Sequence, residues 1–81
     1  MPRPSIHDPK YRRLLNRLKA ARESAELTQL EASKRLRKPP NYVNRIETGE
    51  RRIQVLDLGE LARIYNKPLR FFLPESPSEH E

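Results

Sequence analysis

The sequence has no cysteine and no tryptophan, and it has only two glycines and two histidines among 81 residues. Without cysteine, the chain can form neither a disulfide nor a thiolate metal site. Two glycines are too few for a glycine-rich phosphate loop. The histidines, His7 and His80, stand near opposite ends, and the sequence contains no Ser/His/Asp set and no cluster with metal-ligand spacing. We therefore expect no catalytic residue, no metal and no cofactor, and the sequence predicts a protein that is not an enzyme.

Long apolar runs are absent as well. No run approaches the roughly 18 residues of a membrane span, and charged residues follow Met1 too soon for a signal peptide. We therefore expect a cytoplasmic protein with no membrane association. The length allows one small domain, and the hydrophobic share of 35% exceeds that of a typical disordered chain.

Basic residues outnumber acidic ones and are concentrated in one stretch. The chain has 17 Lys+Arg against 11 Asp+Glu, which gives a net charge of +6. Residues 10–52 hold 13 basic and 5 acidic residues, whereas the rest of the chain holds 4 and 6. Such a stretch favours a polyanionic partner, nucleic acid before an acidic membrane. The alternative is a solvated surface that keeps a small domain soluble.

Apolar residues recur at helical spacing, and no strand pattern appears, so we expect an all-α fold. Asp8-Pro9 is typical of a helix start, Thr28 with Glu31 forms a capping box, and Gly49 is typical of a helix end. We expect a flexible arm (1–8), one domain (9–73) and a disordered acidic tail (74–81). Helices are predicted at residues 9–25, 29–36, 40–47 and 55–65, with a short fifth helical turn at 69–73.

Two short helices joined by a tight turn within a small bundle constitute a helix-turn-helix. The stretch from Asn41 to Arg52, NYVNRIETGERR, is similar to the S-Y-V-S-K-I-E-x-G-E-R-R run of the lambda-repressor-like (XRE/Cro-CI) family. The resemblance extends over about residues 14–73. It implies a compact five-helix DNA-binding domain and a sequence-specific transcriptional regulator, a repressor or controller. The resemblance further implies a two-fold dimer that binds a pseudo-palindromic operator in double-stranded DNA. The two recognition helices of such a dimer lie in the major groove about 34 Å apart.

The third predicted helix would be the recognition helix, with Val43 and Ile46 on its apolar side. Asparagine can pair with adenine and arginine with guanine, whereas a proline offers only apolar contact, for example to a thymine methyl group. Three alternatives remain open: Asn41 could be a helix cap, Asn44 a solvent-facing residue and Arg45 a phosphate contact. The predicted base-reading residues are Pro40, Asn41, Asn44 and Arg45.

Four further residues are predicted to bind DNA phosphates, which fixes the register of the protein without reading sequence. In resembling proteins a glutamine at the start of the second helix holds a phosphate, and helix N-termini favour anions. The alternative is that these residues are ordinary solvated surface residues. They are Gln29, Thr48, Arg51 and Arg52.

The resemblance also implies an ion pair between Arg22 and Glu47 that orients the recognition helix. The alternative is two unconnected surface charges, and an exposed pair would stabilise the fold by only ~0–1 kcal/mol. Two positions in the turn between the two helices depart from the family pattern. Arg37 stands where glycine is usual, so a left-handed backbone there would cost ~1 kcal/mol; the alternative is a turn of different shape. Lys38 replaces an apolar residue and is expected to lay its methylenes over the core.

The C-terminal apolar segment offers more apolar area than a small monomer needs to expose. We expect a homodimer through this segment, although closure of the core over the fourth helix would also use it. A second functional hypothesis is an antitoxin that binds a toxin and regulates its own transcription through the helix-turn-helix. The residues of the segment are Leu69, Phe71, Phe72 and Leu73.

Overall fold

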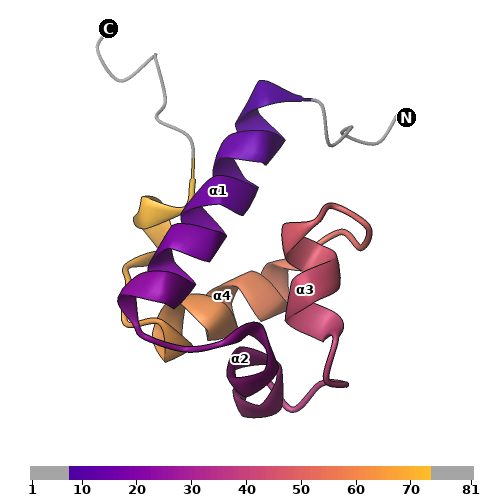
Figure 1. Ribbon diagram of the computed structural model, residues 1–81. Helices are drawn as coiled ribbons and strands as arrows, with labels where there is room; N and C mark the ends of the chain where they lie inside the picture. The colour runs from indigo at the N-terminus through magenta and orange to yellow at the C-terminus, as the bar shows by residue number, and fades with distance from the viewer. Residues whose placement is uncertain (1–7, 74–81) are drawn as a thin grey trace, which may run out of the picture.

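The computed structural model describes residues 8–73, which form four α-helices and one 3-10 helix (Figure 1). No strand occurs within these residues, so the predicted all-α fold is confirmed. Except for Asp8, the predicted arm lies outside the described residues, as does the predicted tail. The elements are α1 (Pro9–Ser24), α2 (Gln29–Arg35), α3 (Tyr42–Glu47), α4 (Val55–Ile64) and the 3-10 helix η1 (Leu69–Phe71).

Local capping signals set the starts of α1 and α2. The Asp8 carboxylate accepts a hydrogen bond from the amide of Lys10 at 2.8 Å, directly before Pro9. The Thr28 hydroxyl accepts from the amide of Glu31 at 3.0 Å, and the Glu31 carboxylate accepts from the amide of Thr28 at 2.9 Å. These hydrogen bonds also lower the pKa of Glu31. Both helices begin where the sequence predicts.

The connection between α2 and α3 differs from the prediction. Arg37 adopts a left-handed backbone with φ 63°, one of the two turn shapes left open by the sequence, and the amide of Lys38 donates to the carbonyl of Ser33 at 3.0 Å, which closes the end of α2. The predicted start of α3 at Pro40 is wrong, because the two consecutive prolines form a turn and α3 begins at Tyr42. Pro40 therefore precedes α3.

The N-terminus of α3 is held by α2. Asn41 occupies the cap position but makes no capping hydrogen bond to any described residue. Instead the hydroxyl of Ser33, which is fully buried on α2, accepts from the amide of Val43 at 3.0 Å. This bond satisfies an amide that has no partner inside α3. It joins the two short helices, neither of which is long enough to be stable alone.

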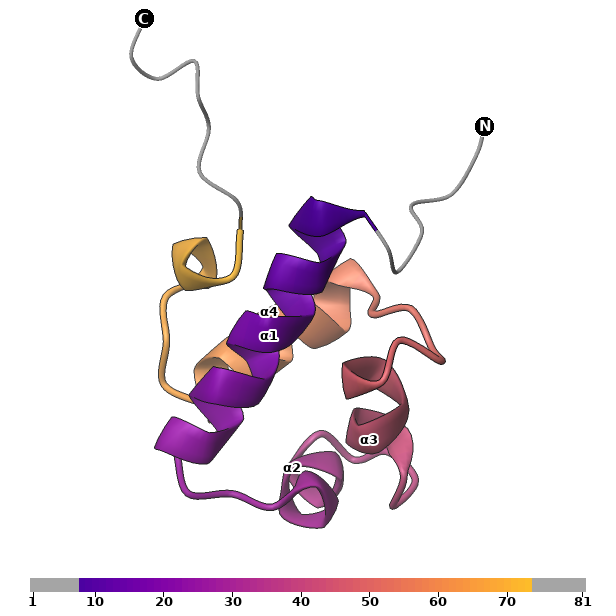
Figure 2. The same ribbon diagram turned by 45° about the horizontal axis from the view of Figure 1, so that its top comes forward.

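All four α-helices contribute to the core, and α1 crosses α4 in both views (Figures 1 and 2). Phe72, just after η1, is only 1% exposed and belongs to the same core, and η1 contacts α4. Arg17 of α1 donates to the carbonyl of Phe71 at 2.9 Å and so fixes η1 against α1. The largest fully buried side chains are Phe72, Leu18, Ile46, Leu61, Val43 and Ser33.

The first turn of α4 lies outside the core, although Val55 is spaced from Leu58 and Leu61 as a buried residue of this helix would be. Val55 is 76% exposed and its neighbour Leu56 is 80% exposed, whereas Asp57 is buried. The first turn extends past the edge of the core, and the buried face begins only at Asp57 and Leu58. None of the described helices combines the length and the apolar character that a membrane crossing requires.

Candidate nucleic-acid interface

Helix α3 buries one side and presents the other to solvent. Val43 and Ile46 are each 1% exposed, whereas Asn41, Asn44 and Arg45 are exposed. Asn44 contacts α2, while Asn41 and Arg45, one helical turn apart, line a hollow beside the loop that follows α3. The exposed face of α3 therefore has two edges with different surroundings.

The first edge, called here the α2-side edge, consists of Arg22, Gln29, Asn44 and Glu47. The guanidinium of Arg22 donates two hydrogen bonds to the Glu47 carboxylate, from Nε to Oε2 at 2.7 Å and from Nη2 to Oε1 at 3.1 Å. The remaining Nη1 donates to the carbonyl of Leu27 at 2.9 Å. The two side chains are only 10% and 6% exposed, so this pair is buried and not a surface pair. Its hydrogen bond to Glu47 raises the pKa of Arg22.

Two amides extend the α2-side edge to solvent. Gln29 donates from Nε2 to Oε1 of Glu47 at 2.9 Å, and Asn44 donates from Nδ2 to Oε1 of Gln29 at 3.1 Å. A continuous hydrogen-bonded chain thus links the buried ion pair to an exposed residue of α3. The sequence predicts a phosphate contact for Gln29 and base reading for Asn44, whereas in the structure the two side chains are hydrogen-bonded to each other.

Tyr65 of the α4 C-terminus belongs to the same part of the core. Its hydroxyl is buried and has no hydrogen-bond partner within the part of the chain that the structure describes. Burial raises the pKa of Tyr65, and the negative charge of Glu47 raises it further. A buried hydroxyl that lacks a partner carries a desolvation cost without compensation.

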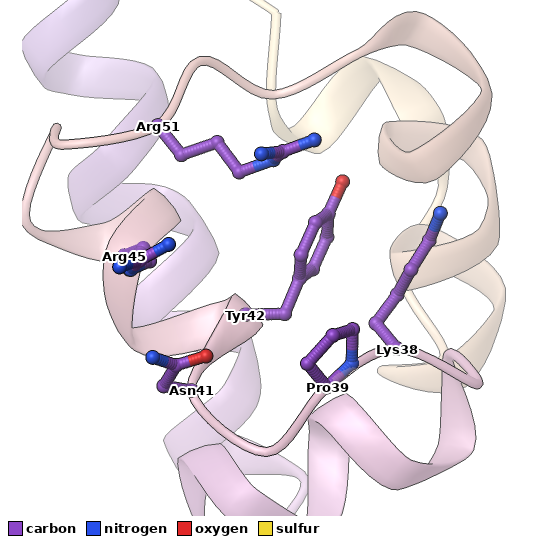
Figure 3. A pocket seen from close by; sticks show the side chains of 6 residues that line it. All are labelled: Lys38, Pro39, Asn41, Tyr42, Arg45 and Arg51. Atoms are coloured by element: carbon purple, nitrogen blue, oxygen red, sulfur yellow. The ribbon is translucent and has the colours of Figure 1, made fainter.

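The second edge, called here the loop-side edge, consists of Lys38, Asn41, Arg45 and Arg51 around the ring of Tyr42 (Figure 3). With Pro39 these residues line an open hollow of about 260 Å³. The Nζ of Lys38 lies 5.2 Å from the centroid of the Tyr42 ring, and Cζ of Arg51 lies 5.0 Å from it. Both distances suit cation–π attraction.

Hydrogen bonding from α4 holds the aromatic ring of this edge in place. The Tyr42 hydroxyl donates to the carboxylate of Asp57, and both residues are buried. Burial and this hydrogen bond raise the pKa of Tyr42, while Arg51 lowers it. Among the cations of this edge, Arg45 forms an exposed ion pair with Glu50, from Nε to Oε2 at 3.5 Å, whereas Lys38 and Arg51 lie against the Tyr42 ring. The loop-side edge is therefore positively charged and open.

The remaining predicted phosphate residues lie in the loop after α3. Thr48 donates from Oγ1 to the carbonyl of Arg45 at 3.1 Å and accepts from the amide of Glu50 at 3.4 Å. Arg52 lies over Tyr11 of α1, with Cζ 6.0 Å from the ring centroid, whereas Arg51 lies over Tyr42. The two neighbouring arginines therefore take different directions.

Sequence reasoning missed three residues of this surface: Lys38 as a cation beside α3, Tyr42 as the ring that two cations share, and Asp57 as its anchor. The basic character of the turn was visible in the sequence, but the approach of Lys38 to Arg51 depends on the turn that the prolines form. Among residues 8–73 no group of three or more His, Asp or Glu side chains is placed to hold a metal ion.

Comparison with known proteins gives one match. Residues 18–72 match a family model described as helix-turn-helix, a span that runs from the middle of α1 to the end of the core at Phe72. No curated protein and no solved structure matches the chain.

Proposed function

Because the chain belongs to the lambda-repressor-like (XRE/Cro-CI) helix-turn-helix family of DNA-binding transcription regulators, we propose that it is a repressor or controller. In this proposal it binds a pseudo-palindromic operator in double-stranded DNA as a homodimer, with α3 in the major groove. Two-fold symmetry places the two recognition helices about 34 Å apart, one turn of DNA.

The observation that carries the proposal is the exposed face of α3. A helix that reads bases needs one side fixed to the protein and short polar or forked basic side chains on the other. Val43 and Ile46 provide the fixed side, and Ser33 ties the first turn of α3 to α2. Asn41, Asn44 and Arg45 are exposed on the other side and can reach base edges, with Pro40 before them for an apolar contact.

Cations on the loop side of this face support the assignment of phosphate contacts. On the loop-side edge, Arg51 and Lys38 frame a hollow that has no acidic residue in its lining. We add Lys38 to the proposed phosphate-binding set, which otherwise keeps the residues expected from the sequence. These are Gln29, Thr48, Arg51 and Arg52.

The proposed dimer uses a smaller surface than the sequence suggested. Phe72 is buried in the core and is not available. Leu69 and Leu73 are 46% and 45% exposed, and Phe71 is half-buried between them. These three residues are the proposed contact.

Analytical sedimentation tests this contact. The wild-type chain should sediment as a dimer, and the Leu69→Ser variant should sediment as a monomer.

Selection of duplexes from a random library, followed by fluorescence anisotropy at several salt concentrations, tests the proposed function. Each neutralised phosphate adds about 0.9 to the slope of log affinity against log salt. Arg51→Gln should lower this slope, whereas Arg70→Gln, which removes the same charge from exposed η1, should leave it unchanged. A flat salt response, or a selection that enriches no sequence, would contradict the proposal.

A further inference from the structure

We infer that Gln29 is a positioning residue that orients the amide of Asn44, and that it thereby makes Asn44 a reader of adenine. This inference rests on the proposed function, because it concerns how the same face of α3 discriminates bases. It assigns Gln29 a role in sequence preference beyond any phosphate contact that it makes.

The argument begins at the Glu47 carboxylate, which can only accept hydrogen bonds. Arg22 occupies both of its oxygens, and Oε1 accepts a further bond from Gln29. Gln29 must therefore turn its NH₂ group toward Glu47, because its own carbonyl would face the carboxylate oxygen without a hydrogen between them. This fixes the Gln29 carbonyl in the direction of α3.

The same reasoning fixes Asn44. The Gln29 carbonyl only accepts, so Asn44 turns its NH₂ group toward Gln29, at 3.1 Å. Asn44 then presents its carbonyl and its second N–H to solvent. The charge of the buried ion pair thus sets the direction of two amides in sequence, and the second amide lies on the exposed face of α3.

This arrangement selects one base. Adenine offers a donor at N6 and an acceptor at N7 in the major groove, which match the carbonyl and the N–H of an asparagine. Guanine offers two acceptors, N7 and O6, so the Asn44 carbonyl would face one of them unfavourably. Without Gln29 the Asn44 amide could turn over at little cost, and the discrimination would be lost.

Two substitutions of Gln29 separate positioning from simple phosphate contact. Gln29→Met keeps the length of the side chain but neither donates to Glu47 nor accepts from Asn44. Gln29→Lys still donates to Glu47 but cannot accept, so Asn44 would turn its carbonyl toward the new ammonium and present its NH₂ group outward. Asn44→Ala identifies the base pair that Asn44 reads.

The measurement is anisotropy with the duplex that the wild-type protein selects from a random library and with all single base-pair variants of that duplex. At the base pair identified by Asn44→Ala, the wild-type protein should prefer adenine by roughly 5- to 150-fold. Gln29→Met should reduce this preference to about twofold and leave the other positions unchanged. Gln29→Lys should move the preference at that position toward guanine.

A second measurement uses the free protein. The Asn44 side-chain N–H that donates to Gln29 should exchange with solvent more slowly than the second N–H of the same amide, and Gln29→Met should remove this difference. Circular dichroism checks that the variants are folded.

If Gln29→Met weakens binding to all duplexes equally, Gln29 is a phosphate contact only; the inference then fails while the proposed function stands. A freely exchanging Asn44 amide in the wild-type protein would also overturn the inference. If the wild-type protein selects no sequence, the proposed function and the inference fail together.

Discussion

The two edges of α3 hold their side chains in different ways. On the α2-side edge, Arg22, Glu47, Gln29 and Asn44 form a chain of hydrogen bonds that begins at a buried ion pair. On the loop-side edge, Lys38 and Arg51 lie against one aromatic ring beside an open hollow. Hydrogen bonds to bases are directional, whereas attraction between a cation and a phosphate depends little on orientation. The first edge therefore suits discrimination between bases, whereas Lys38 and Arg51 on the second edge suit affinity for the DNA backbone.

The largest expected difference between the edges concerns their two ion pairs. Arg22→Met leaves the buried Glu47 carboxylate without its guanidinium, and this should lower the free energy of unfolding by about 3–5 kcal/mol. Arg45→Met removes the corresponding partner from exposed Glu50 and should change stability by less than about 1 kcal/mol. Urea unfolding followed by circular dichroism measures both. Equal effects of the two substitutions would show that burial does not distinguish the edges.

A smaller contrast concerns the two buried tyrosines. Tyr42→Phe leaves the buried Asp57 carboxylate without the hydroxyl that donates to it, and this should cost about 1–3 kcal/mol of unfolding free energy. Tyr65→Phe removes a buried hydroxyl that has no partner among the described residues, so it should be neutral or stabilising. The same urea titrations decide between these outcomes. A larger loss for Tyr65→Phe than for Tyr42→Phe would contradict this account of the hydroxyls.

The pH dependence of stability provides a further check on Tyr65. Burial raises its pKa in the folded state, so the folded chain keeps the proton where the unfolded chain ionises. The contribution to stability is complete below the unfolded pKa of about 10 and is lost as the pH rises above it. Tyr65→Phe should therefore make the fall in stability above about pH 10 shallower than in the wild-type protein. Parallel curves would show that Tyr65 does not ionise differently in the two states.

Much of this structure follows from signals that are local in the sequence. Asp8 and the Thr28–Glu31 capping box start their helices as predicted, because each acts within three residues. The side of α3 that is buried also follows from the spacing of Val43 and Ile46.

Features that depend on residues far apart in the sequence could not be predicted in this way. The bond between Gln29 and Asn44 joins residues 15 apart, and its direction depends on Glu47. The exposure of Val55 depends on where the core ends, although its spacing places it in line with buried Leu58 and Leu61. Helical spacing specifies a face of a helix, but not whether another element covers it.

The next prediction concerns the affinity of the loop-side edge. Lys38→Met and Arg51→Met should each reduce the slope of log affinity against log salt by about 0.9 if each neutralises one phosphate. Gln29→Met, on the other edge, should change base preference more than it changes this slope. Salt titrations with the selected duplex measure the slopes. If Lys38→Met leaves the slope unchanged, Lys38 stabilises the Tyr42 ring without contacting DNA.

The smallest expected effect belongs to a residue on neither edge. Gly59 lies on the exposed side of α4, and a Cβ added there would meet no atom within 4 Å. Gly59→Ala should therefore raise the free energy of unfolding by about 0.5–1 kcal/mol, because alanine restricts the unfolded chain and favours the helix. Its affinity for DNA and its base preferences should equal those of the wild-type protein. If Gly59→Ala changes the base preference, the side chains on both edges of α3 respond to the overall stability of the protein. The two edges would then have to be compared again in variants of equal stability.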